Sequence, residues 1–170
     1  IASCLVGSEM CIRDRYILTL DELEAGSLDT AEPVIEVEGD LILQLKKDTI
    51  SHLESQGPVI KKGTGTLTIR GEGSLELESA DAEAISSDWN GEELDADHPS
   101  AVRLETGNLT FTGAGSGIVD ETVELAGAQG TITATSTSGA AVKTAHVKRE
   151  GSNSDKLELI GATAVAVPES

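Results

Sequence analysis

A short apolar pattern recurs at a nearly constant interval along the chain, and it limits the possible folds more than any other feature. Pairs of small and apolar residues end at Ile35, Ile60, Ile85, Ile118, Val142 and Val165, at successive intervals of 25, 25, 33, 24 and 23 residues. Between them lie copies of a Gly-polar-apolar-polar-apolar pattern, such as Gly65–Ile69 and Gly107–Phe111. Alternation with period two is typical of half-buried strands. Three such strands per interval predict one coil of a parallel β-helix.

We therefore predict an all-β fold: a right-handed parallel β-helix (solenoid) over residues 34–170, with about five coils of roughly 24 residues each. Each coil exposes aliphatic side chains that only the next coil, about 4.8 Å away, can cover. The aromatic residues Tyr16, Trp89 and Phe111 are few, which suits a narrow interior. A β-sandwich is the alternative, because it is also built from short alternating strands. The regular spacing favours the solenoid.

Two segments depart from the repeat. Residues 16–33 are expected to form an N-terminal cap or leading segment, and Leu18–Leu28 is the one stretch that could form a short helix. The interval of 33 residues contains an acidic stretch at 87–99, and leaving out about ten of its residues restores the common spacing. We expect this stretch to be a loop inserted into one coil.

Residues 1–15 differ in composition from the rest of the chain. The run Leu5–Asp14 resembles one reading frame of a transposon-end adapter used in DNA sequencing libraries. This resemblance implies that residues 1–15 are a non-native, adapter-derived scar, which is excluded from reasoning about the fold. Cys4 and Cys11 both lie there, so residues 16–170 offer no disulfide, thiolate ligand or thiol nucleophile. The same resemblance implies that the native start of the chain, with any signal peptide, has been replaced by this scar.

Charge excludes several classes of function. The 30 acidic and 12 basic residues give a formal net charge of −18, so the chain would repel nucleic acid. No apolar run is long enough for a membrane-spanning helix.

The sequence contains no recognisable catalytic motif in which His52, His98 or His146 has a serine or cysteine partner. Arg70 and Arg103 could serve as bases of a polysaccharide lyase, although surface ion pairs are the simpler interpretation.

The segment Gly65–Leu77 resembles a family of secreted or cell-surface bacterial β-helix proteins with carbohydrate-binding domains. The family's coils carry alternating Gly-x-Leu-x-Ile steps followed by an Asp-Gly-Ile-x-Ser-Asp-like step. In this chain that step reads Asp81–Asp88, with Glu83 and Ala84 in place of Asp-Gly. The resemblance implies an extracellular module that binds acidic or neutral polysaccharide, often with calcium.

The insertion at 87–99 carries the candidate site. Carboxylate oxygens are the ligands that Ca²⁺ prefers, and an exposed indole can stack on a sugar ring. The alternative is a solvated acidic loop without a ligand, in which Trp89 only covers the coil beneath it. The predicted ligand-binding residues are Asp88, Trp89 and Asn90, and the predicted metal ligands are Asp88, Glu92, Glu93, Asp95 and Asp97.

The sequence thus predicts a monomeric, non-catalytic polysaccharide-binding module at the outside of a bacterial cell, with Ca²⁺ as the candidate cofactor. The expected partner is a polysaccharide or cell-wall glycan, with no nucleic acid partner and no insertion into a membrane. Two alternatives stay open: a structural stalk or adhesin segment, and a polysaccharide lyase. Outward glutamates such as Glu76 and Glu124 fit any of these, because surface charge also maintains solubility.

Overall fold

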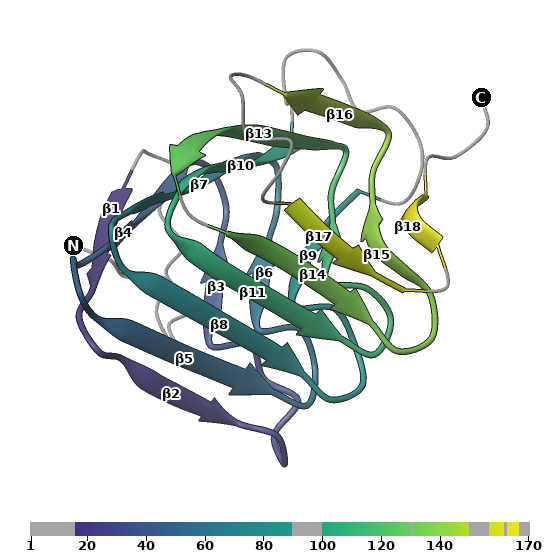
Figure 1. The fold of residues 1–170 in the computed structure, drawn as a ribbon. Helices are drawn as coiled ribbons and strands as arrows, with labels where there is room; N and C mark the ends of the chain where they lie inside the picture. Colours follow the sequence, from purple (N-terminus) through teal and green to yellow (C-terminus); the bar gives the residue numbers. More distant parts are fainter. Residues whose placement is uncertain (1–15, 90–99, 130, 150–156, 162, 167–170) are drawn as a thin grey trace.

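The computed structural model describes residues 16–89, 100–129, 131–149, 157–161 and 163–166, and the strands in these residues form three parallel sheets (Figure 1). Sheet I contains β1 (Tyr16–Leu20), β4 (Leu41–Leu45), β7 (Gly65–Gly71), β10 (Ser100–Thr106), β13 (Thr122–Gln129) and β16 (His146–Arg149). Sheet II contains β2 (Glu24–Ser27), β5 (Ile50–Ser55), β8 (Ser74–Ser79), β11 (Asn108–Gly113), β14 (Ile132–Ser136) and β17 (Leu157–Ile160). Sheet III contains β3 (Ile35–Val37), β6 (Ile60–Lys62), β9 (Ile85–Ser87), β12 (Ile118–Val119), β15 (Ala140–Lys143) and β18 (Thr163–Ala166).

Each coil contributes one strand to each sheet, so strands three apart in sequence pair side by side. We number the coils by these triplets, from coil 1 (β1–β3) to coil 6 (β16–β18), which together make about five full turns. In sheet III the register aligns Ile35 with Ile60, Ile60 with Ile85, and Ile85 with Ile118. It then aligns Ile118 with Val142 and Val142 with Val165. The repeat read from the sequence is therefore the coil period, and the predicted parallel β-helix is confirmed.

The core consists of aliphatic rows that run from coil to coil. In β4 the side chains alternate, with Leu41, Leu43 and Leu45 buried and the residues between them only partly buried. Leu43 is aligned with Ile69, and Ile69 with Leu104, so each inward side chain lies against its counterparts in adjacent coils. Phe111, the aromatic residue of this interior, is fully buried in the same cluster. Burial of apolar area between coils contributes about 25 cal/mol per Å², which makes stacking the main source of stability.

Buried serines complete the corner after sheet II in coils 2, 3 and 5. Ser55 is aligned with Ser79 at the ends of β5 and β8, and both side chains are buried. The Ser79 hydroxyl donates to the Gly57 carbonyl at 2.7 Å, and the Ser136 hydroxyl donates to the Gly115 carbonyl at 2.8 Å. Each hydroxyl thus satisfies a carbonyl where the chain turns and the sheet ladder is interrupted.

Glycine is required at the start of the repeat pattern because the coils approach closely there. Gly39 and Gly65 have φ angles of 96° and 104°, a region that residues with a Cβ rarely adopt. A Cβ on Gly65 would lie 2.4 Å from the Gly39 carbonyl oxygen of the preceding coil. Gly65 therefore permits both the turn and the close approach of the two coils at this point.

The N-terminal segment differs from its expected form. The helix considered for Leu18–Leu28 is wrong, because these residues contribute to strands β1 and β2 of coil 1. Alternation of Tyr16, Leu18 and Leu20 with polar or exposed residues supports a strand. This pattern outweighs the acidic residues Asp21, Glu22 and Glu24, which also suit the first turn of a helix. Residues 16–33 therefore supply the first two strands of the stack, paired with β4 and β5.

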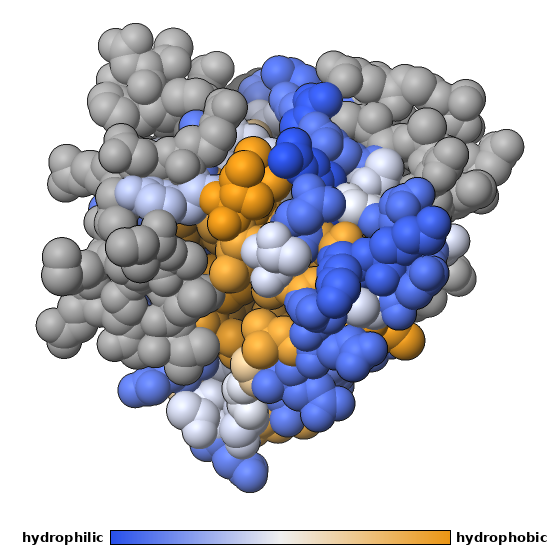
Figure 2. Space-filling model, turned by 90° about the vertical axis from the view of Figure 1, so that its left-hand side faces the viewer, coloured by the Kyte–Doolittle hydropathy of each residue, from blue (hydrophilic) through white to orange (hydrophobic). Residues whose placement is uncertain are grey.

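Coil 1 leaves part of the apolar interior visible. Figure 2 views the molecule from the side that carries β1, where hydrophobic side chains gather between hydrophilic ones. Tyr16 and Leu18 are only partly buried although they point inward, and Ile17 is 59 % exposed.

None of the described residues forms a helix that is long and apolar enough to cross a bilayer.

Replacing a core residue of one strand tests the stacking model. We expect Leu53→Ala in β5 to lower the free energy of unfolding by about 2–5 kcal/mol, because the fully buried side chain leaves a cavity between coils. Ile50→Ala in the same strand is the control, since Ile50 is 62 % exposed and its loss should change stability by less than about 0.5 kcal/mol. Urea denaturation measures both, and equal effects of the two substitutions would contradict the inward assignment of Leu53.

Candidate functional site

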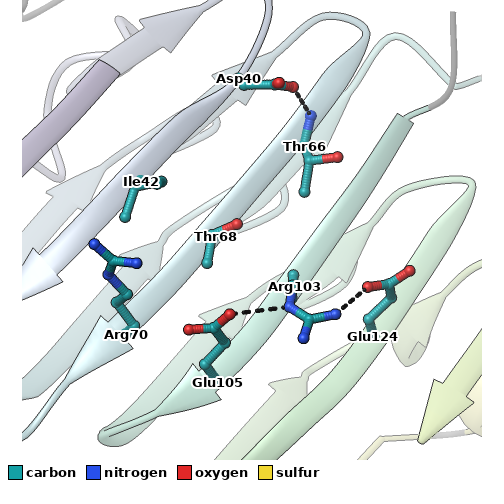
Figure 3. Close-up of a pocket in the computed structure, with 8 residues that line it drawn as sticks. All are labelled: Asp40, Ile42, Thr66, Thr68, Arg70, Arg103, Glu105 and Glu124. Carbon is teal, nitrogen blue, oxygen red and sulfur yellow. Dashed lines mark hydrogen bonds and ion pairs between the residues drawn. The ribbon is translucent and has the colours of Figure 1, made fainter. Parts of the chain in front are cut away.

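A shallow groove of about 380 Å³ crosses the outward face of sheet I over four adjacent coils. Its lining side chains are almost all polar or charged and come from β7, β10, β13 and the start of β4 (Figure 3). The lining residues are Asp40, Ile42, Thr66, Thr68, Arg70, Arg103, Glu105 and Glu124. The sheet register places Ile42, Thr68, Arg103 and Glu124 in one row along the solenoid axis. The groove therefore follows the direction in which coils are added.

Arg103 is held between two carboxylates at one side of this groove. Its Nε donates to Glu105 Oε1 at 3.0 Å, and its Nη1 donates to Glu124 Oε2 at 2.9 Å. Glu124 also lies 3.6 Å from Lys148 Nζ in the next coil. The expected surface ion pair of Arg103 is confirmed, and it fixes the guanidinium in one orientation.

Arg70 has a different environment at the other side. Its Nε donates to the Gln44 side-chain oxygen at 2.9 Å, and it forms no ion pair with a carboxylate among the described residues. The Asp40 carboxylate accepts a hydrogen bond from the Thr66 backbone N–H at 2.8 Å, which fixes the upper end of the groove. The groove thus presents a guanidinium, two threonine hydroxyls and several carboxylate oxygens to solvent, which are donors and acceptors suited to a hydroxyl-rich ligand.

The structure places only the first residues of the predicted site at 87–99. Asp88 is exposed directly after β9, and its Oδ2 lies close to Gly63 of coil 2. Trp89 is 4 % exposed, so the prediction of an exposed indole face that stacks on a sugar is wrong for this structure. Apolar burial outweighs exposure for so large a side chain. Its indole Nε1 is also buried and has no hydrogen-bond partner among the described residues.

The other predicted site residues lie outside the described residues: Asn90, Glu92, Glu93, Asp95 and Asp97. Their roles as ligand-binding residues and as Ca²⁺ ligands stay predictions.

A second group of ligating side chains lies on the outward face of sheet II. The ligand atoms of His52, Glu54 and Glu78 all lie within 4.8 Å of one another, on β5 and β8 of adjacent coils. His52 Nδ1 also lies 3.3 Å from Glu76 Oε2, and its Nε2 lies 3.3 Å from Glu54 Oε2. One imidazole nitrogen with carboxylate oxygens is a donor set for a transition metal rather than for Ca²⁺, which takes oxygen ligands.

The two glutamates change the protonation of His52. Partial burial lowers the pKa of His52, but the hydrogen bonds and charges of Glu54 and Glu76 outweigh it, so the pKa is raised above its ordinary value of 6.5. Since the side chain is 35 % exposed, solvent screens part of this interaction.

The His52 cluster was not predicted from the sequence. Glu76 was expected on an outward face, but His52 was treated as isolated. The signal was present in the coil period, because His52 precedes Glu76 by 24 residues and the register aligns the two. Comparing residues one coil apart, rather than residues adjacent in the sequence, would have found it.

Comparison of the chain with models of known protein families, with characterised proteins and with solved structures gives no match. The resemblance to carbohydrate-binding β-helix proteins therefore stays a prediction based on the sequence motifs.

The raised pKa of His52 predicts a pH-dependent contribution to stability. A folded-state pKa above the unfolded value gives stabilisation that is complete below about pH 6.5 and lost as the pH rises through the folded-state pKa. We expect His52→Gln to lower the free energy of unfolding by about 0.2–1 kcal/mol more at about pH 5.5 than at about pH 8.5. Urea denaturation at both pH values measures this difference. His146→Gln, at an exposed position in β16, is the control, and an equal pH dependence in both variants would contradict the assignment.

Proposed function

We propose that the protein is a non-catalytic module that binds polysaccharide along the groove of sheet I. The observation that supports this function best is the groove itself, which crosses four coils and presents fixed donors and acceptors on a rigid scaffold. Extended glycans bind through many hydrogen bonds to their hydroxyl groups, and a row with one side chain from each of four coils can contact successive sugars of such a chain. The acidic and basic groups of the groove suit both hydroxyl donors and hydroxyl acceptors.

Preorganisation supports this role. Arg103 is oriented by Glu105 and Glu124, and Arg70 is oriented by Gln44, so little side-chain entropy is lost when a ligand binds. Ile42 adds a small apolar surface beside Thr68, against which the C–H face of a sugar can pack. None of the described lining residues is aromatic, so the proposed affinity comes from hydrogen bonds and multivalency rather than ring stacking.

The proposed function also includes Ca²⁺ at the inserted loop. Asp88, Glu92, Glu93, Asp95 and Asp97 supply the carboxylate density that Ca²⁺ requires, and the loop is inserted between β9 of coil 3 and β10 of coil 4. Both coils also contribute strands to sheet I, which carries the groove: β7 belongs to coil 3 and β10 belongs to coil 4.

Affinity electrophoresis against a panel of neutral and acidic polysaccharides tests the glycan function. We expect retention on at least one polysaccharide, and we expect Arg70→Ala to weaken it about 10- to 100-fold, because a charge-assisted hydrogen bond contributes about 1.5–3 kcal/mol. Thr68→Ala should weaken retention less. Thr110→Ala is the matched control, since Thr110 is a partly buried outward threonine on sheet II. Absence of retention on every glycan would contradict the proposal and favour the structural stalk, whereas unsaturated products would indicate a lyase.

Calcium binding has a separate test. If the loop holds Ca²⁺, addition of CaCl₂ after chelation should raise the melting temperature, since a ligand at 100 times its Kd stabilises by about 2.7 kcal/mol. The double variant Asp95→Asn/Asp97→Asn should abolish this shift. Glu76→Gln/Glu78→Gln on sheet II should retain it. A melting temperature that is insensitive to Ca²⁺, or a shift abolished only by the sheet II variant, would overturn the loop assignment.

A further inference from the structure

A lysine and an aspartate are fully buried where sheet III turns into sheet I. Lys62 is aligned with Val37 of coil 1 and Ser87 of coil 3, so its side chain points into the solenoid. Asp120 lies two residues after Ile118 in coil 4, just as Ser87 lies two residues after Ile85 in coil 3, and the register aligns the two isoleucines. The side chain of Asp120 is buried and also points inward. Both side chains are 0 % exposed, and Lys62 Nζ lies 2.7 Å from Asp120 Oδ2. The pair thus connects coil 2 with coil 4 and spans coil 3, whose strand β9 leads into the insertion at 87–99.

The surroundings fix both groups. Lys62 Nζ donates to the Gly63 carbonyl at 3.1 Å and to the Ser100 hydroxyl at 2.6 Å. Asp120 Oδ1 accepts hydrogen bonds from the Ser100 hydroxyl and from the Glu121 backbone N–H, the latter at 2.7 Å. Oδ2 faces the amine, whereas Oδ1 faces two donors. Two donors aimed at one carboxyl oxygen form the arrangement that stabilises negative charge on that oxygen during acyl transfer.

Burial disfavours the charged form of Lys62. Burial lowers the pKa of Lys62 below its ordinary value, although the charge and hydrogen bond of Asp120 oppose this change. Transfer of one proton from Nζ to Oδ2, across 2.7 Å, converts the ion pair into an amine and a carboxylic acid. A buried neutral pair costs less desolvation free energy than two buried charges. An amine and a carboxylic acid are the two reactants of amide formation.

We propose that Lys62 and Asp120 condense within the folded chain to form an intramolecular isopeptide bond. Nζ attacks Cγ of the protonated carboxyl group, and Oδ1 takes the negative charge beside Ser100 and the Glu121 N–H. One nitrogen proton then passes to the Oδ2 hydroxyl, Oδ1 regains its double bond, and Oδ2 leaves as water. One N–H remains on the amide nitrogen and donates to the Gly63 carbonyl. The reaction forms one C–N bond, breaks one C–O bond and needs no oxidant.

An exposed pair provides an internal comparison. Lys46 Nζ lies 2.7 Å from Asp21 Oδ2, the same distance as in the buried pair, but both side chains are more than half exposed. The hydrogen bond to Asp21 raises the pKa of Lys46, so its ammonium form is favoured. Water also solvates both charges there. Distance alone therefore predicts two cross-links, whereas burial predicts only the one at Lys62.

Intact-mass spectrometry of the denatured full chain tests the proposal. We expect the mass to lie below that of the sequence by one water molecule, and proteolysis should release a branched peptide that joins Lys62 to Asp120. No peptide should join Lys46 to Asp21. A full sequence mass for the correctly folded protein would overturn the proposal, as would a branched peptide joining only Lys46 and Asp21.

Variants separate this bond from other losses of water. Lys62→Met/Asp120→Asn replaces both groups by uncharged side chains of similar size, so the fold is retained and the full calculated mass should return. A water loss that persists in this variant would overturn the proposal. Ser100→Ala keeps the amine and the carboxyl group but removes one donor to Oδ1. We expect it to lower the cross-linked fraction soon after purification, and an unchanged fraction would overturn the role assigned to Ser100.

Discussion

The structure depends on one interaction, the contact of each aliphatic side chain with its counterparts in the coils before and after it. A single coil of three short strands cannot bury its own inward residues, and it leaves the edges of its strands unpaired. Stacking resolves both problems at once, because the same translation that pairs the backbones also covers the side chains. Ile35, Ile60 and Ile85 illustrate this rule, since each is fully buried and aligned with the next. Stability is therefore distributed along the axis rather than concentrated in one centre.

This dependence explains why the fold could be predicted from the sequence. The inward pairs must recur with the coil period, and the insertion adds residues without shifting that register, since Ile85 still aligns with Ile118. The N-terminal segment was harder to interpret because Asp21, Glu22 and Glu24 also suit the first turn of a helix. Pairing of Tyr16–Leu20 with β4 decided the outcome, and this contact is not local in sequence.

The sites were less accessible to sequence analysis because they join residues of different coils. The groove combines Arg70 with Arg103 and Glu124, whose proximity follows only from the register of β7, β10 and β13. Trp89 was interpreted from its acidic neighbours, whereas its own size favours burial. The burial of Lys62 and Asp120 could have been predicted, because alternation with period two from Ile60 and from Ile118 places both side chains at inward positions. A charged residue at an inward position breaks the expected pattern, and two such residues in one corner are a signal of a buried pair.

The insertion leaves coil 3 after β9 and the chain rejoins the stack at β10 with the sheet pairing intact. The scaffold consequently imposes no particular length on what lies between these two strands. A peptide of unrelated sequence, grafted in place of residues 90–99, would be displayed at a fixed height on the solenoid while the neighbouring turns keep their pairing.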